Sequence, residues 1–183
     1  MLFVRGQRVD MQTLAAALGV GRTTLYRWVG DRERLIAEVL GALTDQTWEL
    51  AAAPATGEGL ERVLDTIRRF MQVTADFPPL RHFAEREPAL ALRILLSQDG
   101  VVADRLRAGA RRTLEENLPN AGHISPETVD ILVQVGTALE WTPIAIGEEP
   151  EIQRAIVLMR AALQPVAGAN GGARPLLDTK LAP

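Results

Sequence analysis

Apolar positions recur at helical spacing along most of this chain, in blocks separated by Gly, Pro and Asp. Residues three or four positions apart share one face of a helix, so each block predicts an amphipathic helix. The clearest block spans residues 60–75 and precedes Pro78 and Pro79. Its apolar side holds Leu60, Val63, Leu64, Ile67, Phe70, Met71 and Thr74. We therefore predict a helix there with one side buried.

The remaining blocks carry helix start and stop signals. We expect helices over about residues 10–18, 22–29, 32–53, 80–87, 88–118, 125–147 and 151–166. Gly19 and Gly30 follow the first two segments, where glycine often ends a helix, and Pro54 stops the third. Gly100 is expected to break or kink the segment 88–118. Because strand signals are almost absent, the predicted fold class is all-α.

The last two predicted helices are apolar on more than one face. The first has Val129, Ile131, Leu132, Val133, Val135, Leu139 and Ile144, and the second has Ile152, Ile156, Val157, Leu158, Met159 and Leu163. A helix that is apolar on two faces needs cover on both. We expect the second cover to be an identical chain, which gives a homodimer with a four-helix interface.

Composition argues against several classes of function. The chain has no Cys, and its two histidines, His82 and His123, lie far apart in the sequence. Disulfides and thiolate chemistry are thereby excluded, and a histidine metal site is not expected. No Ser-His-acid set, phosphate loop or paired carboxylates are found, so we expect no enzyme and no cofactor. Polar residues interrupt every apolar stretch, so we expect no membrane span and a cytoplasmic protein.

Charge is distributed unevenly along the chain. The net charge of −3 by itself argues against a nucleic-acid-binding protein. Residues 1–34, however, hold six Arg against three acidic residues, whereas the rest of the chain holds 14 basic against 20 acidic residues. A basic N-terminal segment therefore precedes an acidic body, which favours DNA as a partner of the N-terminal segment.

The most informative segment is residues 11–29, MQTLAAALGVGRTTLYRWV. The small Ala15 allows a second helix to pack closely, Gly19 permits a tight turn, and Leu25 fills the core between the two helices. The second helix then exposes Arg22, Thr23, Thr24, Tyr26 and Arg27. Hydroxyls, guanidinium groups and free backbone N–H groups at a helix start suit phosphates and base edges in a major groove. The pattern predicts a helix-turn-helix.

This segment resembles the DNA-binding signature of the TetR family of repressors. The family pattern has the form Ala-x-x-x-Gly-Val-x-x-x-x-Leu-Tyr-x-x-Phe-x-x-Lys-x-x-Leu. The chain matches it at Ala15, Gly19, Val20, Leu25, Tyr26 and Leu35, with Arg32 in place of the common Lys. It departs from the family at Asp10, often Thr, at Trp28, often His, and at Val29, often Phe.

The resemblance implies which residues contact DNA. The implied positions are Arg22, Thr23, Thr24, Tyr26, Arg27 and Arg32, with Tyr26 and Arg32 mainly on phosphate. The family also has a full helix ahead of the motif, whereas this chain offers only residues 1–5 there, so the first helix is expected to be truncated.

Two downstream segments, 86–96 and 138–150, resemble the C-terminal domain of the QsdR-type branch of the family, which is linked with lactone catabolism. This resemblance implies a small hydrophobic effector such as a lactone or acyl compound. Our candidates for effector binding are Phe70, Met71, Thr74, Thr137, Glu140 and Trp141. The first three could equally be ordinary helix core, and Glu140 could instead pair with an Arg or face solvent.

These observations divide the chain into three parts. We expect a helix-turn-helix DNA-binding domain in residues 1–45, an effector-binding and dimerisation domain in 46–167, and a flexible tail in 168–183. The predicted function is a ligand-responsive transcriptional regulator, a repressor that a hydrophobic small molecule releases from a palindromic double-stranded operator. The alternative is a helical small-molecule-binding or dimerisation protein that does not bind DNA.

Overall fold

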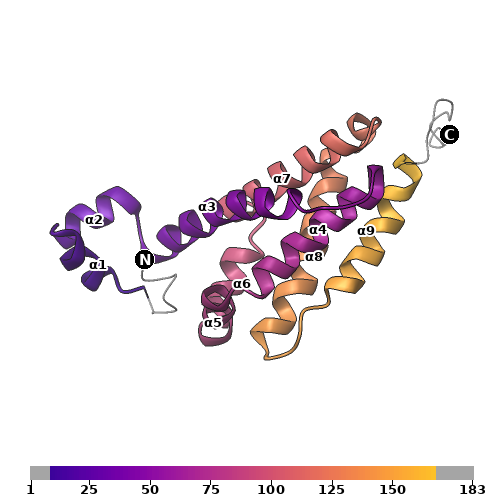
Figure 1. Ribbon diagram of the computed structural model, residues 1–183. Helices are drawn as coiled ribbons and strands as arrows, with labels where there is room; N and C mark the ends of the chain where they lie inside the picture. Colours follow the sequence, from indigo (N-terminus) through magenta and orange to yellow (C-terminus); the bar gives the residue numbers. More distant parts are fainter. Residues whose placement is uncertain (1–8, 168–183) are drawn as a thin grey trace, which may run out of the picture.

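The structure, a computed structural model, describes residues 9–167. The expected flexible tail, 168–183, and the expected truncation of the first helix lie outside the described residues. Figure 1 shows a small head, made of α1 (Met11–Leu18) and α2 (Arg22–Val29), at one end of the long helix α3 (Arg32–Ala52). The described residues form helices and no strand. The predicted all-α fold class is therefore confirmed.

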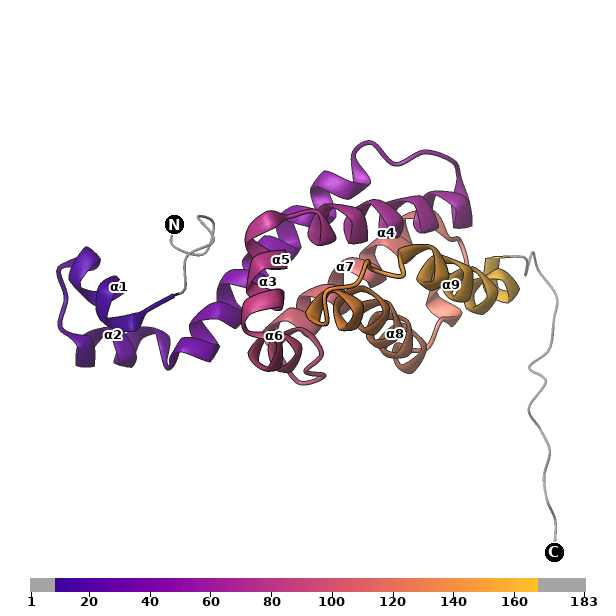
Figure 2. The same cartoon turned by 90° about the horizontal axis from the view of Figure 1, so that it is seen from below.

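The other elements are α4 (Gly59–Ala75), α5 (Pro78–Arg86), α6 (Pro88–Leu95), α7 (Val101–Asn117), α8 (Pro126–Ala145) and α9 (Ile152–Ala167). A 3-10 turn, Ala121–His123, precedes α8. In the body, α3 packs against α4, α6 and α7, and the other helices pack on these, so that the molecule is elongated with the head at one end (Figure 2).

Two helix boundaries differ from the sequence-based expectation. Pro78 and Pro79 form the first turn of α5 as well as following α4, because proline lacks only an N–H that a first turn leaves unbonded. Gly100 separates two helices that were expected as one broken or kinked segment, and its extended backbone begins α7. Ser125 caps α8 as expected, since its hydroxyl accepts the Thr128 N–H at 3.1 Å.

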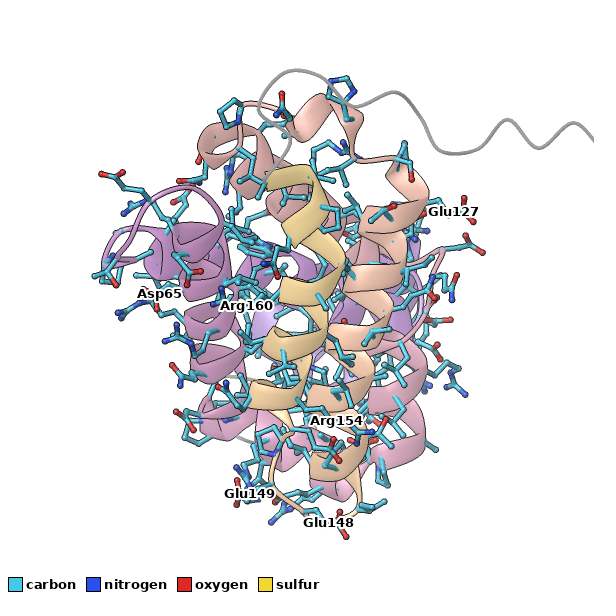
Figure 3. All side chains as sticks on the ribbon, turned by 90° about the vertical axis from the view of Figure 1, so that its right-hand side faces the viewer. Asp65, Glu127, Glu148, Glu149, Arg154 and Arg160 are labelled. Carbon is cyan, nitrogen blue, oxygen red and sulfur yellow. The ribbon has the colours of Figure 1, made fainter. Side chains whose placement is uncertain are left out.

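Close packing of α3 against α7 organises the body. Gly109 on α7 lies against the Trp48 ring of α3, where an added Cβ would come within 2.1 Å of Trp48 Nε1. Trp48 also stacks on Phe70 of α4, with ring centroids 4.3 Å apart. On the opposite side, α9 lies between α4 and α8, as Figure 3 shows. These five helices thus surround one apolar interior.

The outer faces of α8 and α9 keep large apolar side chains in solvent. The exposed ones are Ile131 on α8 and Val157 and Leu158 on α9. They belong to the two helices for which the sequence predicts a dimer interface, and that interface stays a prediction. Among the described residues, no helix combines the length and apolar character needed to cross a membrane.

Candidate DNA interface and effector cavity

Local capping and a small core shape the head. Asp10 begins α1 by accepting the N–H of Thr13 at 3.1 Å and its hydroxyl at 2.7 Å, and these bonds lower the pKa of the Asp10 carboxyl. Gly19 ends α1 with a φ of +67°, a conformation that favours glycine. Ala15 and Leu25 are buried between the helices, as the motif predicts. The turn at Gly19 and the packing of Ala15 and Leu25 therefore determine the angle between α1 and α2.

The outer face of α2 carries most of the predicted DNA contacts. Arg22, Thr23, Tyr26 and Arg27 are exposed, and Thr24 is half-buried. The Arg22 guanidinium lies over the Tyr26 ring, 5.6 Å from its centroid, which holds the two side chains together. Gly21 begins the helix without a side-chain cap, so the first backbone N–H groups of α2 remain available to an anion.

Arg32, the first residue of α3, bonds to residues outside α2. Its guanidinium makes two bonds to the Glu87 carboxylate, at 2.6 and 2.9 Å, and its Nε donates to the Val9 carbonyl at 2.6 Å. Arg32 therefore ties the start of α3 to the α5–α6 junction, and its contact with phosphate stays a prediction.

Trp28 departs from the family pattern, which often has His at this position. Its side chain is 61% exposed, near the end of α2 and next to Arg27. Leu18, the last residue of α1, is also exposed. The head therefore presents apolar as well as basic groups.

A cavity of about 220 Å³ occupies the centre of the body. All six candidate effector residues line it: Phe70, Met71, Thr74, Thr137, Glu140 and Trp141. Helical periodicity brought the first three to one face of α4, and the other three come from α8. The exposed side chains of Gln46, Leu50 and Val73, on α3 and α4, also line the cavity and mark its opening to solvent.

Several lining residues were not anticipated from the sequence. Trp48 and Thr44 reach the cavity from α3, Leu106 and Leu114 from α7, and Met159 from α9. Their spacing gave only a generic core signal, because which of two buried faces meets a cavity depends on how the helices pack. The Trp48 N–H is buried without a hydrogen-bond partner among the described residues.

Among the described residues, Glu140 is the one ionisable side chain that lines the cavity. Its side chain is 4% exposed, so it does not face solvent, and no Arg between residues 9 and 167 pairs with it. The Thr74 hydroxyl lies 2.5 Å from its Oε1. Burial raises the pKa of Glu140 to about 8, and the bond to Thr74 offsets only part of that effect. The carboxyl is therefore largely neutral at pH 7.

A family profile described as a tetracyclin repressor-like C-terminal domain matches residues 58–164, more than half of the chain. The chain belongs to the TetR family. The match covers α4 to α8 and most of α9, and the head and α3 lie ahead of it.

Relatives of this TetR-family chain are transcriptional regulators. It is 26% identical over 172 residues to an uncharacterised HTH-type transcriptional regulator of Mycobacterium tuberculosis, in strains CDC 1551 and H37Rv. That alignment covers 91% of this chain and 74% of the mycobacterial protein.

Two solved TetR-family structures share the fold. The transcriptional repressor QsdR of R. erythropolis matches with a TM-score of 0.80 and 28% identity, over 95% of this chain and 92% of QsdR. This match confirms the predicted resemblance to the QsdR-type branch. The repressor AlkX of a Dietzia strain, implicated in biodegradation of n-alkanes, has a TM-score of 0.57 and 22% identity, over 87% and 86% of the chains. At that identity it shows the shared fold alone.

Proposed function

We propose that this TetR-family protein is a cytoplasmic homodimeric repressor, released from a palindromic operator by a hydrophobic small molecule such as a lactone or acyl compound. The observation that carries the proposal is the exposed polar face of α2. Arg22, Thr23, Tyr26 and Arg27 stand outward on a helix whose other side is buried, and the helix start is open to an anion. Such a face suits insertion in a major groove, with Thr24 at its edge.

A dimer places two such helices on one DNA molecule. Two-fold symmetric regulators read half-sites about one helical turn apart, near 34 Å, or a multiple of that distance. The apolar outer faces of α8 and α9 supply a self-complementary surface for the dimer. Effector binding then favours a dimer whose two heads are not spaced to fit both half-sites. Such a switch requires a coupling free energy of about 1–3 kcal/mol between effector binding and DNA binding.

The geometry supports a route from the cavity to the head. Leu80 of α5 and Leu95 of α6 line the cavity, and Glu87 joins these two helices. Glu87 holds Arg32, and Arg32 holds the backbone of Val9 immediately before α1. A ligand that shifts α5 and α6 therefore acts on the segment that positions the head.

The test is selection of bound sequences from a randomised double-stranded DNA library, followed by titration of the selected duplex. We expect a palindromic sequence whose affinity falls steeply with salt, since each phosphate contact releases a counterion. Arg22→Ala and Tyr26→Ala should each lower affinity by about tenfold or more while the fold persists. Arg112→Ala, which removes an exposed charge from α7, is the matched control and should bind as wild type.

Absence of any enriched sequence, or equal affinity of all three variants, would overturn the proposal. The alternative, a helical binding protein without DNA binding, predicts that outcome.

A further inference from the structure

The cavity wall contains one ionisable side chain, the Glu140 carboxyl. The lining comes from α3 to α9 and from Phe77, and among the described residues it includes no other acid and no Arg, Lys or His. A buried carboxylate without a cation is costly, because removal from water penalises the charged form. The wall therefore holds a carboxyl whose neutral form is favoured, facing an apolar space.

The hydrogen bonds open to the Thr74 hydroxyl are compatible with a neutral Glu140 carboxyl. The Thr74 hydroxyl lies 2.9 Å from the Phe70 carbonyl and 3.1 Å from that of Met71, besides its 2.5 Å contact with Glu140 Oε1. Carbonyl oxygens only accept, and a hydroxyl has one proton to give. Thr74 can give that proton to Glu140 Oε1 or to one of the two carbonyls, and in the second case a neutral Glu140 carboxyl supplies the proton of the short bond between them. The second carboxyl oxygen makes no hydrogen bond with any described residue.

Two other threonine hydroxyls in the cavity wall donate their protons to backbone carbonyls. Thr44 donates to the Leu40 carbonyl at 2.9 Å, and Thr137 donates to the Val133 carbonyl at 2.7 Å. These bonds close turns within their own helices. Glu140 is therefore the buried group with a free oxygen, and that oxygen can donate or accept as its proton moves between the two carboxyl oxygens.

Taking the cavity as the effector site of the proposed repressor, we propose that it selects an uncharged, oxygen-bearing aliphatic molecule whose one polar group hydrogen-bonds to the Glu140 carboxyl. An organic anion would lie beside a carboxyl with no cation near it. An organic cation would require an ionised Glu140, and the buried pair would lack the extra hydrogen bonds that offset the loss of water. An alkane leaves the carboxyl oxygen unbonded.

Cavity size sets the length of the molecule. An apolar cavity of roughly 150 Å³ accommodates benzene, so the 220 Å³ found here suits a molecule of about eight to ten non-hydrogen atoms. The exposed apolar side chains of Leu50 and Val73 at the opening suit passage of an alkyl chain. A matched set of eight-carbon probes therefore tests the inference: 2-octanone, n-octane, n-octylamine and octanoate.

The experiment is calorimetric titration of the full-length protein with each probe at pH 6.5, and of 2-octanone also at pH 9. We expect 2-octanone to bind about fivefold to tenfold more tightly than n-octane, from one hydrogen bond to a neutral carboxyl. Octylamine and octanoate should bind more weakly than either. Affinity for 2-octanone should fall several-fold at pH 9, because Glu140 then ionises with no facing cation on any lining helix.

Variants isolate the carboxyl. Glu140→Gln keeps a donor and an acceptor, so it should retain 2-octanone binding and lose its pH dependence. Glu140→Leu should bind the ketone and the alkane equally. Tighter binding of octylamine, equal binding of ketone and alkane by the wild type, or binding of no probe would each overturn the inference. The wild-type arms decide it even if a variant fails to fold, and the operator titration, made without ligand, tests the proposed DNA binding separately.

Discussion

At the scale of single residues, the contact between Trp48 and Gly109 sets how closely α3 and α7 approach. The indole lies where any Cβ at Gly109 would stand, whereas a Cβ at Gly136 on α8 would meet only the terminal methyl of Met159, at 2.7 Å. A rigid ring held by stacking on Phe70 moves at greater cost than the end of a methionine. The two glycines therefore differ in what they tolerate.

We expect Gly109→Ala to lower the free energy of unfolding by about 1–3 kcal/mol, the usual range for overpacking. The displaced indole should also enter the cavity and weaken 2-octanone binding. Gly136→Ala should change stability by less than about 1 kcal/mol, because alanine favours the helix and Met159 can turn aside. Urea unfolding of the two variants measures the difference, and equal losses would contradict the assigned packing.

The buried Glu140 carboxyl makes stability depend on pH. Its pKa in the folded protein, about 8, exceeds the ordinary value of 4.5, so between these values the folded state holds one more proton. Stability from this group is complete at low pH and is lost as pH rises through that window.

Relative to Glu140→Gln, the wild type should therefore lose up to about 1.4 kcal/mol of unfolding free energy per pH unit between pH 5 and 8. Urea denaturation at several pH values measures this. Glu148→Gln, an exposed control between α8 and α9 (Figure 3), should follow the wild-type curve. Parallel curves for wild type and Glu140→Gln would show that Glu140 is not buried as described.

Residues whose partners are close in sequence could be predicted, and those with distant partners could not. The caps at Asp10 and Ser125 follow from short spacing between side chain and backbone. Glu140 stood out as a carboxylate on an apolar helix, yet its bond to Thr74 crosses 66 positions. Nothing in local spacing distinguishes Trp48 from an ordinary core residue, since its environment is created when α3 meets α7.

At the scale of elements, the first turn of α3 is fastened to the body by two ion pairs. Arg32 pairs with Glu87, and Arg93 of α6 pairs with Glu33 at 2.6 Å. The resemblance to the family implies that Arg32 contacts DNA, and that contact stays a prediction. The Glu87 partner lies 55 residues away, at a helix junction that the sequence placed correctly but could not orient.

We expect Glu87→Gln to loosen the head, because the Arg32 guanidinium loses its charged partner while the side chain keeps its size. Loss of a partly buried charged hydrogen bond should lower the local opening free energy by about 1 kcal/mol, which speeds amide exchange in residues 11–29 about fivefold. Hydrogen exchange with mass spectrometry measures this. Glu85→Gln, two residues earlier on α5, removes only an exposed pair with Arg81 and should leave exchange unchanged.

At the scale of the whole molecule, the fold explains why two copies should act together. The head is small and holds only a few groups that we predict to contact phosphate, so one copy should gain limited affinity for DNA. Linking two heads makes the second contact intramolecular, which typically strengthens binding by about 10²-fold to 10⁴-fold. The face viewed in Figure 3, formed by α8 and α9, is the one whose exposed apolar side chains call for such a partner.

A charge on that face should therefore separate the subunits and weaken DNA binding together. Val157→Glu places a carboxylate where the partner is expected, at a side chain 56% exposed in the single chain, so the variant should fold normally. Light scattering should show a monomer, and operator affinity should fall by about a hundredfold. Ala108→Glu adds the same charge on the exposed side of α7 and should remain dimeric. If the Val157→Glu variant stays dimeric, the interface lies elsewhere on the molecule. A monomeric wild type would contradict the pairing of two heads on one DNA molecule, because nothing else would hold two copies of α2 at the spacing of successive grooves.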